Sequence, residues 1–567
     1  MTAPHGRWGT PVRLGRVAAE RYGSGVRWLR VGRREVVRAI ALVVRDRDWR
    51  TPDPLRLRID RRDGALTLRG VTAVGAGELA WSFRVAATAG GLDAHARLTA
   101  LGDVDVNRAG LVVLLPCATC AGARFAVRHR AGGRTSRGRL PVDVAPHQPL
   151  LDVATLELAT RDGTKLSLAF DGDTFEMEDQ RNWLDPTFKL YNRELALPVP
   201  YRIADGATVE QRVALRVDHV GRGAAPRPGP RRGRVPALGV ATAPGRVPEG
   251  AAARACAALG ASGVTHRADG TAADAARAGA FARAIGAGLT VEAIGAAAGH
   301  APAFAAQAPA RIALYGVGDE AAQALVRDLR DATAAGGTFS DFVMLNRNGV
   351  PAWARRATFA LCPTVHARDD RSLVETLAAL DDVFARARRV AGGRPIDAGP
   401  CSLRRRLVPR TGLPAPDDVD PRQHEAIAAA WLACAIAVAG ARRIDTFCAF
   451  EAAGARGLLA DGTPLRATRA SSVFAALASA QGRPLVLLGL DPARGAAFVV
   501  DGTLWLVELS GRARRLGTSR PALHLAATRW ASRRVGQPVA GYGIATLPAG
   551  SAIAGWTERL AAAWTGA

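Results

Sequence analysis

Hydrophobic and polar residues alternate with a period of two over most of the first 220 residues. Leu55, Leu57 and Ile59 alternate with arginine and aspartate, and Asp63-Gly64 then leads into a second alternating stretch. The same period recurs near residues 83, 127, 158, 168 and 213. Because successive side chains of a strand point to opposite faces, and Asp-Gly favours hairpin turns, these stretches predict antiparallel strands. So many strands predict an N-terminal β-sandwich over residues 1–220.

A different pattern begins near residue 237, where short apolar stretches alternate with helical ones. Eight apolar stretches are centred near residues 240, 266, 292, 315, 344, 362, 399 and 447. Eight strand-helix units are the number that a (β/α)8 barrel of the TIM type needs. We therefore predict such a barrel over residues 237–470, with helices over 319–334 and 372–390. Its active face is expected at the carboxyl ends of the strands.

Two shorter segments flank the predicted barrel. Residues 221–236, GRGAAPRPGPRRGRVP, combine proline, glycine and arginine without apolar periodicity, which is typical of a linker. Beyond residue 480 the period of two returns, and Asp501-Gly502 has the composition of a hairpin turn. Residues 480–567 are therefore predicted to form a small C-terminal β-domain, so that the chain is a multidomain α/β plus β protein.

Composition narrows the functions that the chain can have. With 567 residues, 48% of them hydrophobic and 22% charged, it has the composition of a folded protein of several domains. No apolar run reaches the length of about 18 residues that a membrane span needs, so we expect no membrane partner. The 76 basic residues include only two lysines, Lys165 and Lys189, and the arginines are dispersed. A nucleic-acid-binding protein concentrates such residues on one face, so despite a net charge of +25 we expect no nucleic-acid partner.

The cysteines and the motifs that are missing favour a cytoplasmic protein without a metal or cofactor. The seven cysteines are odd in number and scattered, and no secretory signal is recognised, so we expect a reducing compartment, the cytoplasm. The chain has no P-loop, no G-x-S-x-G elbow, no H-E-x-x-H and no G-x-G-x-x-G motif. Cys117 and Cys120 form a lone C-x-x-C pair, which favours two small core residues over a zinc site.

The densest group of polar residues lies in GDTFEMEDQRNWLDPTFKLY, residues 172–191. Glu176, Glu178, Asp179, Arg181 and Asn182 crowd together immediately after a predicted strand. One interpretation is an ion-pair network that joins the sandwich to the barrel, because Glu176 and Glu178 share a strand face and Arg181 can bind either. The other is a loop that reaches over the barrel mouth near His366 and binds a hydroxyl-rich substrate.

A second group, TVHARDDRSLVETL at residues 364–377, lies where the sixth barrel strand is predicted to end. His366 lies at that strand end, which in such barrels faces the active site, and Asp370 either takes part in the chemistry or caps the next helix. Glu292 is the one carboxylate in an otherwise apolar strand, and a buried carboxylate needs a partner or a task. Three more candidates lie at or near strand ends: Arg267, Asn346 and Arg347.

Several of these segments resemble the D-apionate lactonase family. The resemblance is carried by FEMEDQRNW at 175–183, FKLY at 188–191, LNR at 345–347 and PTVHARDDRS at 363–372, and it extends over nearly the whole chain. It implies the hydrolysis of D-apionolactone to D-apionate in bacterial apiose catabolism. The family pattern has a glutamate, in T-E-L-N-R, where this chain has Met344 at the predicted end of the fifth strand. If that glutamate is the acid or base, the chemistry of this chain is altered, whereas the loss of a supporting glutamate leaves a slower enzyme.

The candidate residues supply the groups that lactone hydrolysis requires. These are a base that activates water, donors for the developing oxyanion and an acid for the leaving alkoxide. Glu292 or Asp370 is the candidate base and His366 the group that transfers the proton. The candidate donors are Arg267, Asn346 and Arg347, and no step needs a metal. Two rival hypotheses are a barrel-type glycoside hydrolase, which uses paired carboxylates, and a non-catalytic sugar-acid binding homologue.

Overall fold

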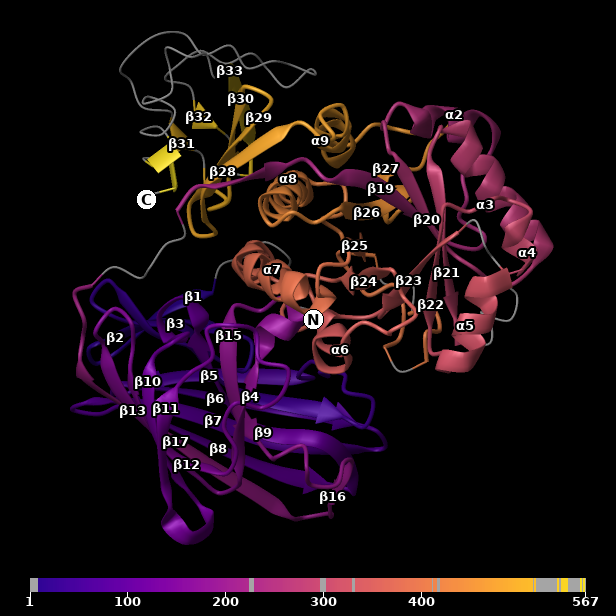
Figure 1. The fold of residues 1–567 in the computed structure, drawn as a ribbon. Helices are drawn as coiled ribbons and strands as arrows, with labels where there is room; N and C mark the ends of the chain where they lie inside the picture. The colour runs from indigo at the N-terminus through magenta and orange to yellow at the C-terminus, as the bar shows by residue number, and fades with distance from the viewer. Residues whose placement is uncertain are drawn as a thin grey trace. The chain divides into compact units, whose positions relative to one another are not determined.

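The computed structural model describes residues 9–223, 229–295, 302–328, 332–409, 411–415, 419–512, 514–515, 538–539, 542–548, 561–562 and 564–565. Their contacts divide the chain into two compact units (Figure 1). One unit comprises Met1–Arg181 and Pro186–Pro226, and the other comprises Asn182–Asp185 and Arg227–Ala567. The short stretch Asn182–Asp185 therefore belongs by its contacts to the second unit, although its neighbours in the sequence belong to the first.

The first unit contains two antiparallel sheets. One has the strand order β1-β2-β3-β4-β9-β15-β14, with β16 paired to β9. Its strands are β1 (Thr10–Leu14), β2 (Val17–Tyr22), β3 (Gly25–Val31), β4 (Arg34–Asp46), β9 (Val104–Pro116), β14 (Phe175–Asp179), β15 (Thr187–Asn192) and β16 (Tyr201–Ile203). The other has the order β11-β10-β12-β13-β17-β8-β7-β6-β5. Its strands are β5 (Arg56–Arg62), β6 (Ala65–Val74), β7 (Gly77–Ala87), β8 (Gly91–Leu101), β10 (Arg124–His129), β11 (Thr135–Arg139), β12 (Val153–Ala159), β13 (Lys165–Asp171) and β17 (Thr208–His219).

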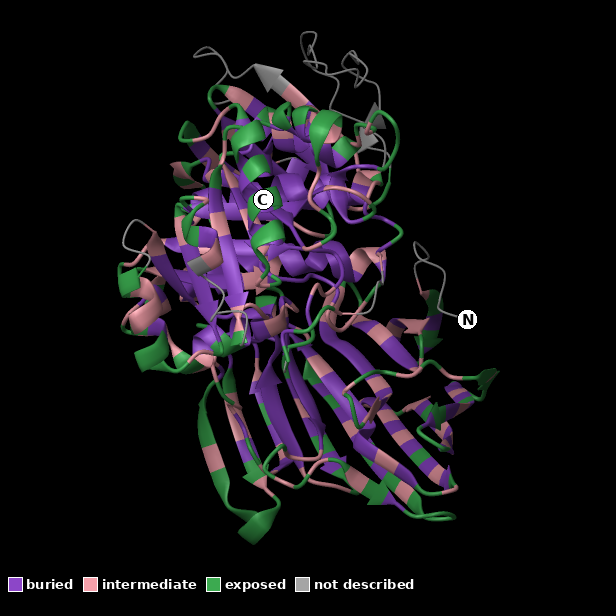
Figure 2. Ribbon diagram, turned by 90° about the vertical axis from the view of Figure 1, so that its right-hand side faces the viewer, coloured by how far each residue is buried: buried purple, intermediate pink, exposed green. Residues whose placement is uncertain are grey.

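The core of this unit lies between its two sheets. In β7, Trp81, Phe83 and Val85 are buried and alternate with less buried neighbours, and Figure 2 shows the same banding along the other strands. Inward-facing side chains of both sheets form one hydrophobic cluster, which confirms the predicted β-sandwich. The predicted hairpin turn is also confirmed, because Asp63 and Gly64, both with positive φ, join β5 to β6.

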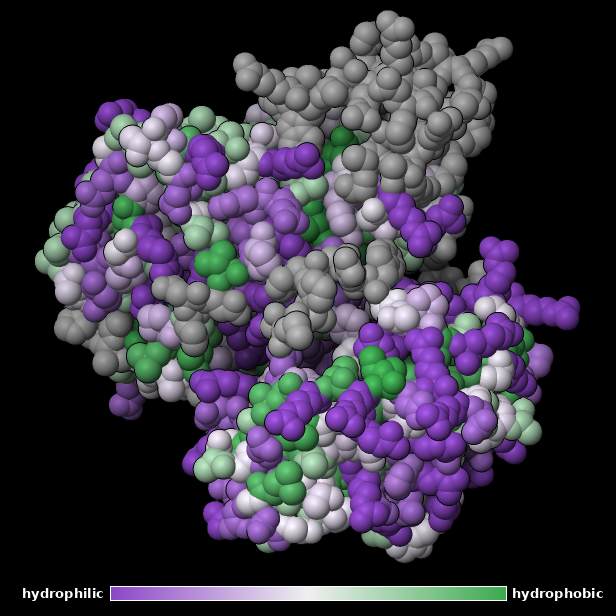
Figure 3. Space-filling view, turned by 180° about the vertical axis from the view of Figure 1, so that it is seen from behind, coloured by the Kyte–Doolittle hydropathy of each residue, from purple (hydrophilic) through white to green (hydrophobic). Residues whose placement is uncertain are grey.

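Short helices and a hydrophilic surface complete the first unit. The helices are α1 (Cys117–Cys120), η1 (Ala131–Gly133) and η2 (Gln180–Trp183), the last of which ends in the second unit. Figure 3 shows mostly hydrophilic side chains, with small hydrophobic groups between them, on the face of this unit seen from behind. Cys117 and Cys120 are both buried and free, which confirms that they are small core residues.

The second unit contains a closed parallel barrel of eight strands, which confirms the predicted (β/α)8 fold. The strands pair in chain order, and β19 pairs with β26 to close the barrel. They are β19 (Ala237–Thr242), β20 (Gly263–Arg267), β21 (Gly288–Ile294), β22 (Arg311–Tyr315), β23 (Thr333–Gly337), β24 (Arg356–Leu361), β25 (Ile396–Cys401) and β26 (Thr446–Ala453), with β27 (Gly457–Leu459) paired to β26.

Helices alternate with these strands along the sequence. They are α2 (Gly250–Ala257), α3 (Ala272–Ala284), α4 (Pro302–Ala305), α5 (Asp319–Asp328), α6 (Phe342–Asn348), α7 (Asp370–Ala391), α8 (Ala426–Ala441) and α9 (Arg469–Ala478). The helix predicted over 372–390 is confirmed as α7, which ends where Gly392 adopts a left-handed conformation. In the part of the chain that the structure describes, no helix is both long and apolar enough to cross a membrane.

The prediction of the fifth barrel strand was wrong. The stretch near residue 344 forms helix α6, and the fifth strand is β23, within and just beyond the segment predicted as a helix over 319–334. That helix, α5, ends at Asp328. The apolar run FVML resembles a buried strand, whereas TAAGG at 333–337 has little β-propensity of its own. Pairing with β22 and β24 on either side makes Thr333–Gly337 a strand.

A further antiparallel sheet lies in the last part of the chain. Its order is β18-β28-β29-β30-β33, and its strands are β18 (Arg231–Arg234), β28 (Pro484–Asp491), β29 (Gly495–Val500), β30 (Thr503–Glu508) and β33 (Ile544–Pro548). A small pair, β31 (Arg514–Arg515) and β32 (Pro538–Val539), also forms. Asp501-Gly502 joins β29 to β30 as predicted. Strand β18 comes from the segment expected to be a linker, so that segment contributes to this C-terminal sheet.

Candidate active site

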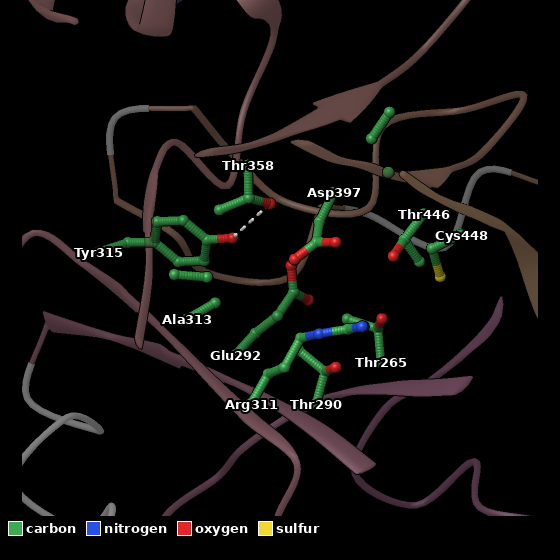
Figure 4. A pocket seen from close by; sticks show the side chains of 13 residues that line it. Thr265, Thr290, Glu292, Arg311, Ala313, Tyr315, Thr358, Asp397, Thr446 and Cys448 are labelled. Atoms are coloured by element: carbon green, nitrogen blue, oxygen red, sulfur yellow. Dashed lines mark hydrogen bonds between the residues drawn. The ribbon is translucent and has the colours of Figure 1, made fainter. Parts of the chain in front are cut away.

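The lumen of the barrel holds a layer of polar side chains. Thr265 of β20, Thr290 and Glu292 of β21 and Asp397 of β25 line a cavity of about 20 Å³, which is room for about one water molecule. Figure 4 shows the carboxylates of Glu292 and Asp397 turned into this space. Tyr315, at the end of β22, lines the same cavity, and burial raises the pKa of its hydroxyl far above the ordinary value.

Glu292 is held by a bidentate ion pair. Its side chain is 1% exposed, and Arg406, in the loop after β25, donates from Nη1 to Oε2 at 3.2 Å and from Nη2 to Oε1 at 3.3 Å. Burial opposes the charge of Arg406, but the adjacent carboxylate outweighs it and raises the pKa of Arg406 above its ordinary value. The buried strand carboxylate therefore has the partner that its burial requires.

Arg406 is the last of three consecutive arginines that each bind a different carboxylate. Arg404 lies 3.4 Å from Asp420, and Arg405 lies 2.8 Å from Asp341, the residue that precedes α6. The loop after β25 is thus tied at three successive positions to three separate segments of the second unit.

Arg267 lies beside the Glu292–Arg406 pair. It is the last residue of β20 and the register partner of Glu292 in β21. Thr265, two residues earlier, lines the cavity, so the strand period turns Arg267 toward the lumen as well. Burial, and after it the charge of Arg406, lowers the pKa of Arg267 below its ordinary value. Within the described ranges, no hydrogen-bond acceptor or ion-pair partner binds its half-buried guanidinium.

A second bidentate pair lies near Arg267. Arg246, in the loop after β19, donates from Nε and from Nη2 to the two carboxylate oxygens of Glu451, each at 3.0 Å. Glu451 lies near the end of β26 and is 5% exposed. Arg246 also contributes to the lowered pKa of Arg267, which shows that these charges act on one another.

His366 lies in the loop after β24 and is bound by residues that follow η2. Its Nδ1 forms a short hydrogen bond with a carboxylate oxygen of Asp185, and its ring lies 5.8 Å, centroid to centroid, from Trp183. Two residues before it, Thr364 donates a hydrogen bond to the carbonyl of Leu403, which directly precedes the three arginines. His366 and the loop after β25 are therefore held in the same region of the second unit.

Asn346 and Arg347 lie in α6, and not at a strand end as the sequence predicted. Asn346 is 5% exposed; its Nδ2 donates to Oδ1 of Asn182 at 2.9 Å, and its Oδ1 accepts from Nε of Arg386 in α7 at 2.8 Å. These bonds join Asn182 to two helices of the second unit. Arg347 lies in the last turn of α6. The predicted candidates Asn182 and Asn346 are thus in direct contact.

Asp370 is the first residue of α7 and binds an arginine. Asp369, and not Asp370, caps the helix, since it accepts from the backbone N–H of Ser372 at 2.9 Å. Asp370 accepts from Nη1 of Arg422 at 3.0 Å, and Arg422 also binds Asp420 at 2.8 Å. Asp370 therefore belongs to a chain of ion pairs that leads, through Asp420, to Arg404.

The carboxylates of the first cluster are bound within the sandwich unit. Glu176 accepts from the hydroxyl of Tyr191 and from the backbone N–H of Leu195 at 3.0 Å, and burial raises the pKa of Glu176. Glu178 lies 2.7 Å from Lys189, whose pKa burial lowers to about 8. These two carboxylates lie on one strand face, as predicted, and each has a neighbour on β15 as its partner.

Arg181 has the most complete set of partners in this cluster. Its side chain is 1% exposed and binds both oxygens of Asp179, at 2.9 Å from Nε and 2.7 Å from Nη2. The remaining donors reach the carbonyls of Val142 at 2.8 Å and Asp143 at 3.0 Å. Of the predicted cluster, Asn182 alone belongs to the second unit.

Comparison with known proteins shows the family. A model described as the D-apionate lactonase N-terminal domain matches residues 4–220, and one described as the D-apionate lactonase TIM barrel domain matches residues 317–483. The chain belongs to the D-apionate lactonase family. It is 28% identical over 545 residues to the D-apionate lactonase of Brucella anthropi, with 84% of this chain and 89% of that relative covered.

Two solved structures show weaker similarity. A galactose mutarotase-like protein from Lactobacillus casei is 11% identical with a TM-score of 0.29, and the match covers 36% of this chain and 99% of that one. A 4-O-α-L-rhamnosyl-β-D-glucuronidase from Fusarium oxysporum is 12% identical with a TM-score of 0.37, and the match covers 56% and 94%. Similarities of this size carry no functional argument.

Met344, where the resemblance led us to expect a glutamate, lies in a helix of this chain. Met344 is in α6 and is 42% exposed, while Leu345 and Asn346 beside it are buried. Met344 was predicted to lie at the end of the fifth strand, but the structure places it on a helix. Among the described residues, no group of three or more histidine, cysteine, aspartate or glutamate side chains is arranged to hold a metal ion.

Four important residues were missed by the sequence interpretation. They are Asp185, Asp341, Arg406 and Glu451, each the partner of another charged or titratable group in the site. The same argument that singled out Glu292 applies to Glu451, because TFCAFEAA is an apolar strand with one carboxylate. For Arg406 the signal was three arginines directly after a barrel strand, in a position that faces the active side of such barrels.

Proposed function

We propose that this chain hydrolyses a sugar-acid lactone, with D-apionolactone opened to D-apionate in apiose catabolism. Membership of the D-apionate lactonase family, with matches in both the sandwich and the barrel, carries the proposal. The polar groups at the strand ends of the barrel support it, because they include a histidine with a carboxylate partner and several arginines. The substrate is thus a neutral small molecule, and the enzyme is a carboxylic-ester hydrolase.

The reaction requires one water molecule and releases one acid. The water oxygen bonds to the carbonyl carbon of the lactone, the bond from that carbon to the ring oxygen breaks, and the ring oxygen takes up a proton. The product is a carboxylic acid that ionises at neutral pH, so each turnover releases one proton. The protein has to accept a proton from water, stabilise the oxyanion and deliver a proton to the leaving oxygen.

His366 is the residue that we propose for both proton transfers. We propose that Nδ1–H of His366 donates its hydrogen bond to the carboxylate of Asp185. The lone pair of the neutral ring then lies on Nε2, and the bond favours one orientation of the imidazole. A histidine held in this way takes a proton from water and returns it to the leaving oxygen. Such general acid-base catalysis typically contributes about 10² to 10⁴ in rate. Trp183 packs against the same ring and limits its movement.

The other predicted residues take supporting parts in this proposal. Glu292 binds Arg406 through both oxygens, which makes it better suited to fix that arginine than to act as the base. Asp370 is committed to Arg422 in the same way. Arg267 remains available as a donor to the substrate. Arg347 is kept as a substrate-binding candidate, and Asn346 as a residue that positions Asn182.

The remaining candidates, in the sandwich, receive a structural role. Glu176 and Glu178 bind Tyr191 and Lys189 on β15, and Arg181 binds Asp179. We propose that these pairs shape the segment that leads to Asn182.

The decisive experiment follows proton release from D-apionolactone at constant pH. We expect turnover by the purified protein and a loss of about a hundredfold or more in kcat for His366→Ala, with a smaller loss for Asp185→Asn. His95→Ala is the control, because His95 lies on β8 of the sandwich and its side chain is only partly buried. Retention of the full rate by His366→Ala contradicts the assigned role.

The same assay separates the rival hypotheses. A protein that only binds sugar acids releases no protons, and a glycoside hydrolase cleaves an aryl glycoside while leaving the lactone closed. If the wild type is inactive and Met344→Glu opens the lactone, the glutamate of the family pattern is the catalyst. We also propose a cytoplasmic location, supported by seven buried cysteines that are all free.

A further inference from the structure

Three arginines lie close together near the carboxyl ends of β19, β20 and the strands beside them, and two of them are bound by carboxylates. Glu292 neutralises Arg406, and Glu451 neutralises Arg246, each through a bidentate pair. Arg267 lies in register with Glu292, and its pKa responds to both other arginines. Within the described part of the chain it has no partner of its own. Of these three arginines, Arg267 is therefore the one without a carboxylate partner among the described residues.

Neighbouring side chains do not satisfy this guanidinium. Both oxygens of Glu292 already accept from Arg406, so Glu292 cannot form a second bidentate pair with Arg267. Half-burial removes part of the hydration of the guanidinium and supplies no acceptor in exchange, which is unfavourable. A planar anion with two oxygen atoms matches the missing acceptors, because an arginine binds a carboxylate with two parallel hydrogen bonds.

We propose that Arg267 is a binding site for the carboxylate of the ring-opened sugar acid. This inference rests on the proposed lactone hydrolysis, in which a neutral substrate becomes an anionic product. The carbonyl carbon of the lactone becomes the carboxylate carbon of the acid, so the site meets the negative charge where the reaction creates it. Consequently the product binds more tightly than the substrate, and free sugar acids inhibit the enzyme competitively.

The test compares one ligand pair on the full-length protein. Isothermal titration calorimetry measures the binding of D-apionate and of D-apionamide, its neutral isostere, at low and at high salt. We expect the wild type to bind the acid at least tenfold more tightly than the amide, and salt to weaken only the acid. Because this comparison uses the wild type, it does not depend on whether a variant folds.

Variants then assign the effect to one side chain. Arg267→Gln is expected to weaken acid binding at least tenfold and to change amide binding less than threefold, while Arg267→Lys keeps part of the preference for the acid. Arg254→Gln is the matched control, because Arg254 lies exposed on α2 and its loss changes the net charge equally. Equal binding of acid and amide by the wild type overturns the proposal, as does unchanged acid binding by Arg267→Gln.

Failure of the inference and failure of the proposed function give different results. A protein that opens the lactone but shows no preference for the acid retains the function and loses the site at Arg267. A protein that binds the acid through Arg267 but opens no lactone retains the site and loses the function.

Discussion

Replacing Arg406 by methionine tests whether Arg267 can take its place beside Glu292. Methionine keeps much of the length of the side chain and removes the charge, so Glu292, which is 1% exposed, is left as a buried carboxylate without its partner. Removal of one partner of a buried ion pair typically costs about 3–5 kcal/mol of stability. Arg267 lies in register with Glu292 and is free to bind it, however, so we expect Arg406→Met to cost only about 1–2 kcal/mol, because roughly half of the penalty is recovered.

The stability of the double variant shows whether Arg267 takes the place of Arg406 beside Glu292. Arg267→Met alone is expected to change stability by less than about 1 kcal/mol, whereas Arg406→Met with Arg267→Met restores the full cost of about 3–5 kcal/mol. Urea titration followed by tryptophan fluorescence gives the midpoints, which are compared between variants in one buffer. Arg405→Met serves as control, because Arg405 is 39% exposed and binds a different carboxylate, Asp341. Additive costs for the two single variants refute the reasoning, since additivity means that Arg267 does not replace Arg406.

Three further predictions follow from the structure. Arg181→Met removes the guanidinium that binds both oxygens of the buried Asp179 and is expected to cost about 3–5 kcal/mol in a urea titration; unchanged stability contradicts its structural role. Burial raises the pKa of Cys256 and of Cys362 to about 11. The free energy of unfolding is therefore expected to fall as pH rises from about 9 to 11, by up to about 1.4 kcal/mol per pH unit for each thiol. Urea midpoints measured across this pH range are expected to fall less steeply for Cys256→Ala and for Cys362→Ala than for the wild type. Lactone opening is expected at the full rate in EDTA, and a loss that a divalent ion restores counts against the metal-free scheme.

The fold was predictable wherever it depends on local patterns. The period of two identified the sandwich strands, and Gly392-Gly393 marked the end of α7, because glycine readily adopts the left-handed conformation found there. The fifth barrel strand was not predictable in this way. Its sequence, TAAGG, carries little intrinsic preference, and its strand conformation depends on neighbours that are distant in the sequence.

The sequence could suggest candidate site residues, but it could not show which side chains pair with them. His366 and Glu292 became candidates because of their residue type and their position at a barrel strand. Their partners lie 181 and 114 residues away, at Asp185 and Arg406, and no periodicity connects positions so far apart. The sequence likewise placed Arg181 among substrate-binding residues, because the carbonyl groups that occupy its donors become visible only after folding.

The four residues Asn182–Asp185 affect how this protein can be divided. A cut near residue 226 separates the two sequence blocks and keeps all eight barrel strands in one fragment. That fragment nevertheless lacks Trp183 and Asp185, so the imidazole of His366 loses a carboxylate that binds it and an indole that packs against it. A chimaera that joins the first block of a distant homologue to the second block of this chain therefore replaces Trp183 and Asp185 along with the sandwich. Keeping the two blocks together keeps these two residues beside His366.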